Sequence, residues 1–355
     1  MEKALILAEG LFSTTDGKTA HGLVRYSRRY EIVGVIDSTL AGVDAGEVLD
    51  GKPRGIKIFE SLRQALSAHP DVGTLVVGVA TPGGKLPDGY REVIKEALTV
   101  GLNVVSGLHE FLSDDPELAS LAKRSGAAIL DVRKRFRDMR VFYTGKIREV
   151  KALKVVVLGT DSCVGKRTTA IMLSEELNRR GVKSVVVGTG QTAWLQGIEY
   201  GIVLDAMVND FITGGLEHEI VRAYENERPD VIVVPAQGGL IHPVFPGGYE
   251  VLSLVDPEVV ILQHAPARKH LDGYPEAKMP PVSRYIRLLK LMTKEGVSAI
   301  VINTERMSAE DVRRTVEDYE RRFGVIACAP LQEGIGKLAD FVASRIRMET
   351  VEKRQ

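Results

Sequence analysis

The segment GTDSCVGKRTT, residues 159–169, is the part of this sequence best suited to chemistry. It follows an apolar run, residues 153–158, and leads into a stretch with helical periodicity. In such a strand–loop–helix unit, backbone N–H groups and the helix dipole converge on one small volume, and the Lys166 ammonium adds a full positive charge. The segment therefore predicts a site for a phosphorylated ligand. A glycine-rich strand-to-helix turn that binds nothing is the alternative interpretation.

The loop departs from the usual phosphate-binding pattern in two ways. Five residues, where four are usual, separate Gly159 from the Gly-Lys pair, and Arg167 replaces the Ser or Thr whose hydroxyl binds Mg²⁺. The longer spacing resembles the variant loop of dethiobiotin synthetase and its relatives. A guanidinium cannot ligate Mg²⁺, but it can grip a second phosphate. We expect the ligand to contact Gly159, Thr160, Asp161, Ser162, Gly165, Lys166, Arg167, Thr168 and Thr169.

Length and composition favour an enzyme of the cytoplasm. A chain of 355 residues is long enough for two domains of ordinary size. It carries 47 Lys and Arg against 47 Asp and Glu, so no net charge draws it to nucleic acid or to an anionic membrane. Two cysteines are too few for a disulfide framework, and the apolar run at the N-terminus is too short for a signal peptide or a membrane span. We expect a small-molecule substrate.

Strand-like and helix-like segments alternate almost throughout, which predicts two doubly wound parallel-sheet α/β domains, residues 1–150 and 151–355. A dense basic run, residues 133–152, breaks the rhythm and is the expected connector. The strands expected are 3–9, 31–38, 74–80, 102–107 and 127–132 in the first domain, and 154–158, 184–188, 231–235, 259–263, 299–303 and 325–329 in the second. The helices expected are 18–29, 59–68, 88–99 and 116–125, followed by 166–180, 208–226, 282–293, 309–322 and 336–347.

The first domain does not carry the fingerprint of a dinucleotide site. Asp37 follows the second expected strand, where a ribose-binding acid would stand. However, the first turn, residues 8–22, lacks the G-x-G-x-x-G spacing that lets the backbone approach a pyrophosphate. We therefore expect no nicotinamide cofactor. Lys18 and Thr19 could instead hold a carboxylate or a phosphate at the start of the following helix.

Several polar side chains stand where strands of the second domain should end. Gln191 and Thr192 follow one strand, Asp205 and Asp210 lie around the start of a helix, and Gln237, Gly238 and His242 follow the strand VIVVP. His264 follows the strand VVILQ. The carboxyl ends of parallel strands meet at one edge of a sheet, so we expect these residues to line one site. Helix capping is the alternative for one of the two aspartates.

The ordered set AEG…KTAHG, GTDSCVGKRTT, GTGQTAWLQG, DAMVNDFITGGLEHE, PAQGGLIHP and LQHAPARKHLDGYP resembles the D-glutamate N-acetyltransferase-like family over nearly the whole chain. The resemblance implies a Rossmann-like N-terminal domain and a P-loop domain related in fold to dethiobiotin synthetase. It also implies transfer of an acetyl group from acetyl-CoA to an acidic amino acid such as D-glutamate, in a homodimer.

One departure favours coenzyme A over Mg-ATP as the ligand of the loop. Proteins with the related loop commonly carry a Mg²⁺-binding Glu before the next strand-end turn, and Pro235 takes that position here. Phosphoryl transfer depends on a metal that neutralises charge, whereas backbone N–H groups, Lys166 and Arg167 can hold the phosphates of coenzyme A without one. An ATP-dependent ligase or kinase remains the alternative, as does a non-catalytic sensor of a nucleotide or of coenzyme A.

Acetyl transfer requires a base for the acceptor amine and donors for the oxyanion. The candidate catalytic residues are His264, Asp210 and His242. The histidines and aspartates match no ligand spacing for a metal, so we expect no metal site. The sequence leaves the chirality of the acceptor and the identity of the base open. The candidate substrate-binding residues are Lys18, Gln191, Thr192, Asp205, Gln237, Gly238 and Arg268.

Overall fold

The computed structural model describes the backbone of residues 1–352 and the side chains of residues 1–346. Contacts within the chain divide it into two compact units. Unit 1 contains Met1–Met139 together with Gln191–Ile198, and unit 2 contains Arg140–Gly190 together with the chain from Glu199 onward. A short segment from the second half of the sequence therefore belongs to the first unit.

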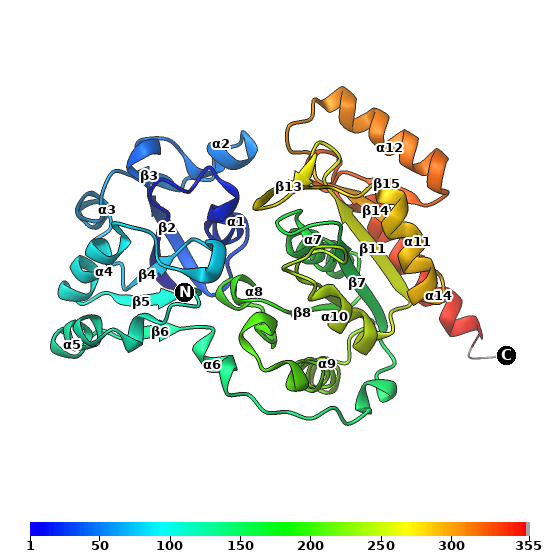
Figure 1. Ribbon diagram of the computed structural model, residues 1–355, viewed down its shortest axis with the longest axis horizontal. Helices are drawn as coiled ribbons and strands as arrows, with labels where there is room; N and C mark the ends of the chain where they lie inside the picture. The colour runs from blue at the N-terminus through cyan, green and yellow to red at the C-terminus, as the bar shows by residue number, and fades with distance from the viewer. Residues whose placement is uncertain (353–355) are drawn as a thin grey trace. The chain divides into compact units, whose positions relative to one another are not determined.

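Unit 1 is built on six parallel strands in the order β3-β2-β1-β4-β5-β6 (Figure 1). The order reverses between β1 and β4, as in a Rossmann fold. The apolar runs that predicted these strands are buried on both faces, as in a sheet covered by helices. The strands are β1 (Glu2–Leu7), β2 (Tyr30–Ile36), β3 (Lys57–Phe59), β4 (Thr74–Val77), β5 (Asn103–Ser106) and β6 (Ile129–Asp131).

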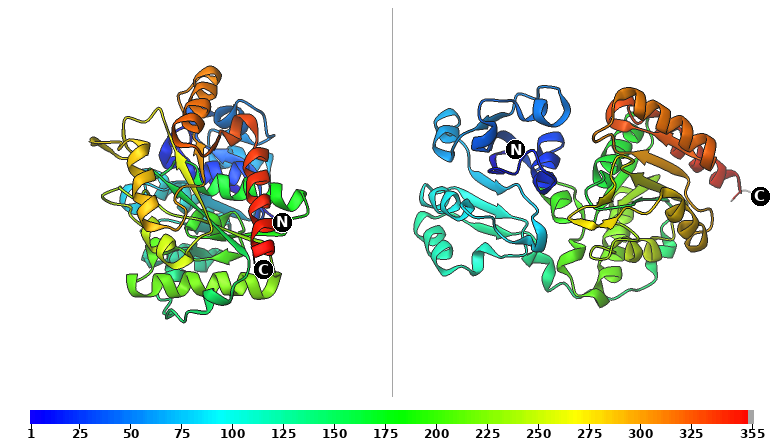
Figure 2. Two further views of the ribbon diagram at one scale, coloured as in Figure 1. Left: turned by 90° about the vertical axis from the view of Figure 1, so that its right-hand side faces the viewer. Right: turned by 45° about the horizontal axis from the view of Figure 1, so that its top comes forward.

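Two helical layers flank this sheet (Figure 2). Helices α1 and α2 contact each other, and α3, α4 and α5 contact one another in sequence. Side-chain caps fix several helix starts: Asp115 accepts from the Glu117 and Leu118 N–H groups at α5, and Ser61 accepts from Gln64 at α3. The helices are α1 (Lys18–Arg25), α2 (Ala45–Asp50), α3 (Leu62–Ala68), α4 (Tyr90–Thr99), α5 (Pro116–Ser125) and α6 (Lys134–Arg137).

Asp37, at the end of β2, holds the loops of unit 1 together. Its side chain is fully buried. Its Oδ2 accepts from the Phe12 N–H at 3.1 Å, and its Oδ1 accepts from the N–H and the hydroxyl of Thr39 at 3.1 and 2.6 Å. Both carboxylate oxygens are therefore used inside the protein, which explains an acid at this position without a ribose.

Unit 2 is built on a sheet of seven strands in the order β15-β14-β11-β7-β10-β8-β9, with every pairing parallel. Together with unit 1, this confirms the predicted class of two parallel-sheet α/β domains. A two-stranded antiparallel hairpin, β12-β13, lies outside the main sheet. The strands are β7 (Leu153–Gly159), β8 (Ser184–Gly188), β9 (Tyr200–Gly201), β10 (Val231–Pro235), β11 (Val259–His264), β12 (His270–Leu271), β13 (Tyr274–Lys278), β14 (Ala299–Ile302) and β15 (Ile326–Cys328).

The central strand of unit 2, β7, is covered on both faces. Val155 and Val157 lie in one apolar core with Leu173 of α7 and Leu338 of α14, while α10 contacts β7 and α9. The loop that follows β7 therefore leaves the sheet between two helical layers. The helices are α7 (Lys166–Arg179), α8 (Gln191–Leu195, in unit 1), α9 (Ile212–Glu227), α10 (Gly248–Val255), α11 (Val282–Met292), α12 (Ala309–Phe323), α13 (Pro330–Glu333) and α14 (Gly336–Glu352).

The structure differs from the predicted elements mainly in short segments. The helix expected over 208–226 begins at Ile212, because a 3-10 turn, Asn209–Phe211, precedes it. Helix α10 and the β12-β13 hairpin were not predicted, since each is too short for a clear periodic pattern. No helix of the described residues is long and apolar enough to cross a membrane.

Candidate functional site

The P-loop, residues 160–165, joins the end of β7 to the first residue of α7 at the carboxyl edge of the unit 2 sheet. Two residues adopt a left-handed backbone conformation that lets the loop close: Gly165 has φ 108° and Cys163 has φ 53°. A Cβ on Gly159 would lie 2.8 Å from Lys166 Nζ and 3.0 Å from the Asp161 carbonyl oxygen, so a side chain there would displace the Lys166 side chain. The sequence thus forms the strand–loop–helix unit that its pattern predicts.

Lys166 lies between the P-loop and the turn that follows β10. Its side chain is buried. Its Nζ donates to the Asp161 carbonyl at 2.8 Å and to the Gly238 carbonyl at 2.6 Å. The two predicted site residues Lys166 and Gly238 are therefore in direct contact. A phosphate that binds Lys166 would compete with these carbonyls for the ammonium.

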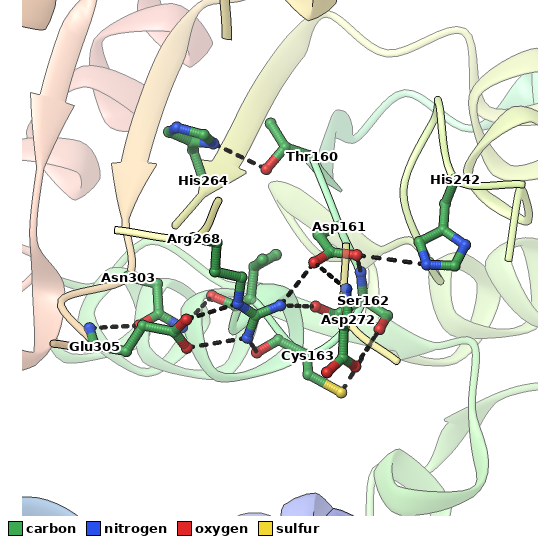
Figure 3. A network of polar contacts seen from close by, with 12 residues as sticks. Thr160, Asp161, Ser162, Cys163, His242, His264, Arg268, Asp272, Asn303 and Glu305 are labelled. Atoms are coloured by element: carbon green, nitrogen blue, oxygen red, sulfur yellow. Dashed lines mark hydrogen bonds and ion pairs between the residues drawn. The ribbon is translucent and has the colours of Figure 1, made fainter. Parts of the chain in front are cut away.

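Arg268 joins the P-loop to the end of β14 (Figure 3). Its Nη1 donates to Asp161 Oδ2 and to the Ser162 carbonyl, both at 2.8 Å, and its Nη2 donates to the Cys163 carbonyl at 3.2 Å. Glu305 accepts from Nε at 2.6 Å and from Nη2 at 3.0 Å. The five N–H donors of the guanidinium thus face protein oxygens, so in this arrangement Arg268 fixes the loop and is not open to a substrate carboxylate.

Electrostatics keep Arg268 charged. Burial alone would lower its pKa, but the Glu305 and Asp161 carboxylates raise it above its usual value. Asp161 is fully buried, and its Oδ2 also accepts from the Asp272 N–H at 2.9 Å. Asp272 in turn accepts from Ser162 Oγ at 2.6 Å. The side chains of Asp161 and Ser162, both predicted to contact the ligand, are therefore used to hold the loop in shape.

Strand β11 and helix α11 also hold the P-loop and the first turn of α7. The Thr160 N–H donates to the Gln263 carbonyl at 3.0 Å, and Thr169 Oγ1 donates to Gln263 Oε1 at 2.6 Å. Tyr285 of α11 donates its hydroxyl to the Thr160 carbonyl at 2.7 Å. Thr169 is buried, whereas Arg167 and Thr168 are half-buried at the first turn of α7. These last two are the side chains of this turn nearest to solvent.

His264 packs behind the P-loop. Its Nδ1 lies 2.9 Å from Thr160 Oγ1, and its ring lies 6.0 Å from that of Tyr319. Burial, with a smaller effect from Arg268, lowers the pKa of His264 to about 4. An imidazole with so low a pKa is neutral at pH 7 and is a weak base. The geometry therefore gives His264 a role in positioning the loop.

His242 also contacts the P-loop through Asp161. Its Nδ1 accepts from the N–H groups of Val244 and Phe245 at 3.2 and 3.1 Å, so the ring proton is on Nε2. Nε2 is buried, has no hydrogen-bond partner within 3.5 Å among the described residues, and lies 3.6 Å from Asp161 Oδ1. Nδ1 uses its lone pair for these two backbone N–H groups and Nε2 carries the ring proton, so neither nitrogen is available to accept a proton from a reacting amine in this conformation.

The turn after β10 fits closely against the P-loop. A Cβ on Gly239 would lie 2.8 Å from the Thr160 carbonyl oxygen, and a Cβ on Gly238 would lie 1.7 Å from that of Phe245. Gly238 also has φ 61°. Gln237 donates from Nε2 to the Thr189 carbonyl at the end of β8. The predicted residues Gln237 and Gly238 therefore stand at the same sheet edge as the loop.

The remaining predicted residues make other contacts. Gln191 and Thr192 belong to unit 1, where Gln191 Nε2 donates to Thr19 Oγ1 at 2.8 Å and the Thr19 and Thr192 hydroxyls are 3.1 Å apart. Lys18, the first residue of α1, is half-buried in unit 1 as well. Asp205 and Asp210 are exposed in 3-10 turns of unit 2.

Sequence reasoning missed four residues of the network: Tyr285, Asp272, Glu305 and Asn303, whose Nδ2 donates to the Val164 carbonyl at 3.0 Å. The positions of Asn303 and Glu305 could have predicted their place in the site, because they follow the apolar strand β14 and so stand at the ligand edge of the sheet. The position of Tyr285 could not, since it lies inside an amphipathic helix. Among the described residues, no group of three or more His, Cys, Asp or Glu side chains could hold a metal ion.

We expect Arg268→Met to destabilise the protein by roughly 3 kcal/mol, because it leaves Asp161 and Glu305 without their cation in a buried setting. The midpoint and slope of equilibrium urea unfolding at pH 7 measure this change. Arg321→Met is the matched control, since Arg321 forms an exposed pair with Asp318 that contributes about 1 kcal/mol or less. Equal effects of the two variants would contradict the role given to Arg268.

The low pKa of His264 predicts a loss of stability in acid. Because the pKa is depressed in the folded state, the stabilisation is present above pH 6.5, the ordinary value, and is lost as the pH falls toward 4. Between pH 7 and pH 4.5 this one group should account for about 2–3 kcal/mol. Urea unfolding of the wild type and of His264→Gln at both pH values measures this difference in the free energy of unfolding. If the free energy of unfolding falls equally with pH in the two proteins, His264 is not the cause.

Comparisons with known proteins agree with this geometry. A model described as "Domain of unknown function (DUF1611_C) P-loop domain" matches residues 141–339, and one described as "Domain of unknown function (DUF1611_N) Rossmann-like domain" matches residues 38–135. The chain is 33% identical over 279 residues to a protein of Tritonibacter scottomollicae named D-glutamate N-acetyltransferase, which covers 76% of this chain and 81% of that one.

A second protein with the same name, from a Pseudoalteromonas species, is 31% identical over 271 residues, or 75% of this chain and 80% of that one. The crystal structure of a DUF1611 family protein from Anabaena variabilis is also similar. It has a TM-score of 0.87 and 30% sequence identity, and the match covers 97% of this chain and all of that one.

Proposed function

This chain belongs to the DUF1611 family, and from that premise we propose that it transfers an acetyl group from acetyl-CoA to the amino group of an acidic amino acid, with D-glutamate as the first candidate. The family predicted from the sequence motifs is thereby confirmed. The observation that carries the proposal is the name shared by the two relatives, each aligned over about three quarters of this chain. Substrate and coenzyme are part of the proposal.

In this proposal the P-loop anchors the phosphates of the coenzyme. The N-terminus of α7 presents backbone N–H groups and the positive end of a helix dipole. Lys166 supplies a buried ammonium, and Arg167, half-buried in the first turn, supplies a fork of donors. The negative charge on the 3′-phosphate or the pyrophosphate of coenzyme A is then balanced by groups that the chain itself provides.

The residues around the loop suit a Mg²⁺–nucleotide poorly. Arg167 stands where a Mg²⁺-binding hydroxyl is usual, and the Thr169 hydroxyl two residues later donates to Gln263. Pro235 fills the strand-end position at which related loops carry an acid. These features support acyl transfer over phosphoryl transfer.

Thiol release from acetyl-CoA, followed with a chromogenic disulfide and a panel of D- and L-amino acids, tests the proposal. We expect release that depends on an acidic amino acid and that EDTA leaves unchanged. Tight binding of acetyl-CoA without turnover for any acceptor would instead identify a sensor. Mg²⁺-dependent release of ADP from ATP with a carboxylate substrate would identify a ligase, and either result would contradict the proposal.

Lys166→Ala should raise the KM for acetyl-CoA by roughly 10- to 100-fold, because a charge-assisted hydrogen bond to phosphate contributes about 1.5–3 kcal/mol. Steady-state kinetics at fixed ionic strength measure the change, and circular dichroism checks the fold. Lys294→Ala is the matched control, since Lys294 is exposed and pairs only loosely with Asp256 at 3.4 Å. An unchanged KM in the Lys166 variant would show that the coenzyme binds elsewhere.

A further inference from the structure

The turn after β10, residues 236–247, is hydrogen-bonded mainly to itself. The Gly239 N–H donates to the Phe245 carbonyl, and the His242 N–H donates to the Gly239 carbonyl, both at 3.0 Å. His242 Nδ1 accepts from the N–H groups of Val244 and Phe245 at 3.2 and 3.1 Å. These bonds shape the turn, but none of them ties it to the sheet or to the P-loop.

One hydrogen bond attaches the middle of this turn to the P-loop. Lys166 Nζ donates to the Gly238 carbonyl at 2.6 Å and to the Asp161 carbonyl at 2.8 Å. Among the residues that the structure describes, the first of these is the only hydrogen bond between residues 238–245 and a residue outside the turn. His242 adds a weaker contact, since its Nε2 lies 3.6 Å from Asp161 Oδ1. The cation proposed to bind a phosphate is thus also the one that holds the turn.

The outer half of the turn lies in solvent. Val244 and Phe245 are 45% and 43% exposed, whereas His242 is 3% exposed. The His242 ring lies 4.9 Å from the ring of Phe245 and 5.5 Å from that of Tyr274 in β13. Without the bond from Lys166, the middle of the turn would be held by side-chain packing alone. A segment with so few attachments opens at a low cost in free energy.

A phosphate in the P-loop competes with the turn for Lys166. An ammonium has three N–H donors, and the Gly238 and Asp161 carbonyls use two of them. A hydrogen bond from an ammonium to a phosphate oxygen joins two charged groups, so it is stronger than one to a neutral carbonyl. The Gly238 carbonyl that loses the ammonium needs another donor, because a buried acceptor without one is costly. Water supplies that donor if the turn moves away from the loop.

We propose that the phosphate end of coenzyme A releases the turn after β10 when it binds Lys166; this inference rests on the proposed function, which places the coenzyme in the P-loop. The turn is closed in the empty protein and open in the coenzyme complex. Opening uncovers His242 and the Asp161 carboxylate, which are buried while the turn is closed. The coenzyme thus controls access to the polar side chains beside the loop.

Hydrogen exchange of the full-length protein, followed by mass spectrometry, tests this release. The reporter is the peptide that covers residues 236–247, because the N–H groups bonded inside the turn are protected only while the turn is packed on the loop. A non-reactive thioether analogue of acetyl-CoA should speed exchange of this peptide in the wild type, and inorganic pyrophosphate should do the same. We expect a change of roughly 10- to 100-fold, which corresponds to the loss of one charge-assisted hydrogen bond. Exchange in β7 should not change.

Lys166→Met separates the hydrogen bond from the ligand. This variant keeps most of the length of the side chain but has no ammonium, so the reporter peptide should exchange without ligand as fast as it does in the liganded wild type. Adding the analogue should cause no further increase. Lys294→Met is the matched control, since Lys294 is exposed and distant from the turn in sequence, and it should behave as the wild type does with and without ligand.

Calorimetry under the same conditions separates failure of the release from failure of the proposed function. If the analogue binds the wild type and exchange of the reporter peptide stays the same or slows, the release is wrong and the coenzyme site stands. Slow exchange in a Lys166→Met protein that melts at the wild-type temperature would overturn the release as well. If neither the analogue nor pyrophosphate binds, the P-loop is not the phosphate anchor, and the proposed function and this inference fail together.

Discussion

The candidate site depends on the hydrogen bonds and ion pair that the Arg268 guanidinium makes with the P-loop. The P-loop needs one left-handed residue that is not glycine, Cys163, and places the Asp161 carboxylate where water does not reach it. Arg268 stabilises both features: it donates to the buried Asp161 carboxylate, and it donates to the carbonyls of Ser162 and Cys163, which hold the backbone of the loop. Glu305 fixes the guanidinium from the other side. The loop N–H groups are thereby held in shape before any ligand arrives.

A second constraint joins the P-loop to the turn after β10. Lys166 donates to Gly238, and Gly239 packs so closely on Thr160 that no side chain fits between them. A phosphate that took the Lys166 ammonium would therefore compete with the Gly238 carbonyl of this turn. The cation beside the N-terminus of α7 and the turn after β10 are therefore parts of one hydrogen-bonded unit.

The sequence predicted the two parallel sheets, most strands and the P-loop, because continuous apolar runs and a glycine-rich turn are local signals. It predicted less well what each polar side chain does. Arg268 follows β11 as a substrate clamp should, yet its partner Glu305 is distant in sequence, so only the fold shows that the two meet. Gln191 and Thr192 follow β8 but join unit 1, which no local pattern indicates.

The central claim is that this loop anchors coenzyme A through groups of the chain alone. Isothermal titration calorimetry tests this anchoring most directly. The protein is titrated with a non-reactive thioether analogue of acetyl-CoA in the presence of EDTA, and separately with ATP in the presence and absence of Mg²⁺. We expect one coenzyme bound per chain, with an affinity that EDTA does not change and that Lys166→Ala weakens. Binding of ATP that requires Mg²⁺, with no heat from the coenzyme analogue, would contradict it.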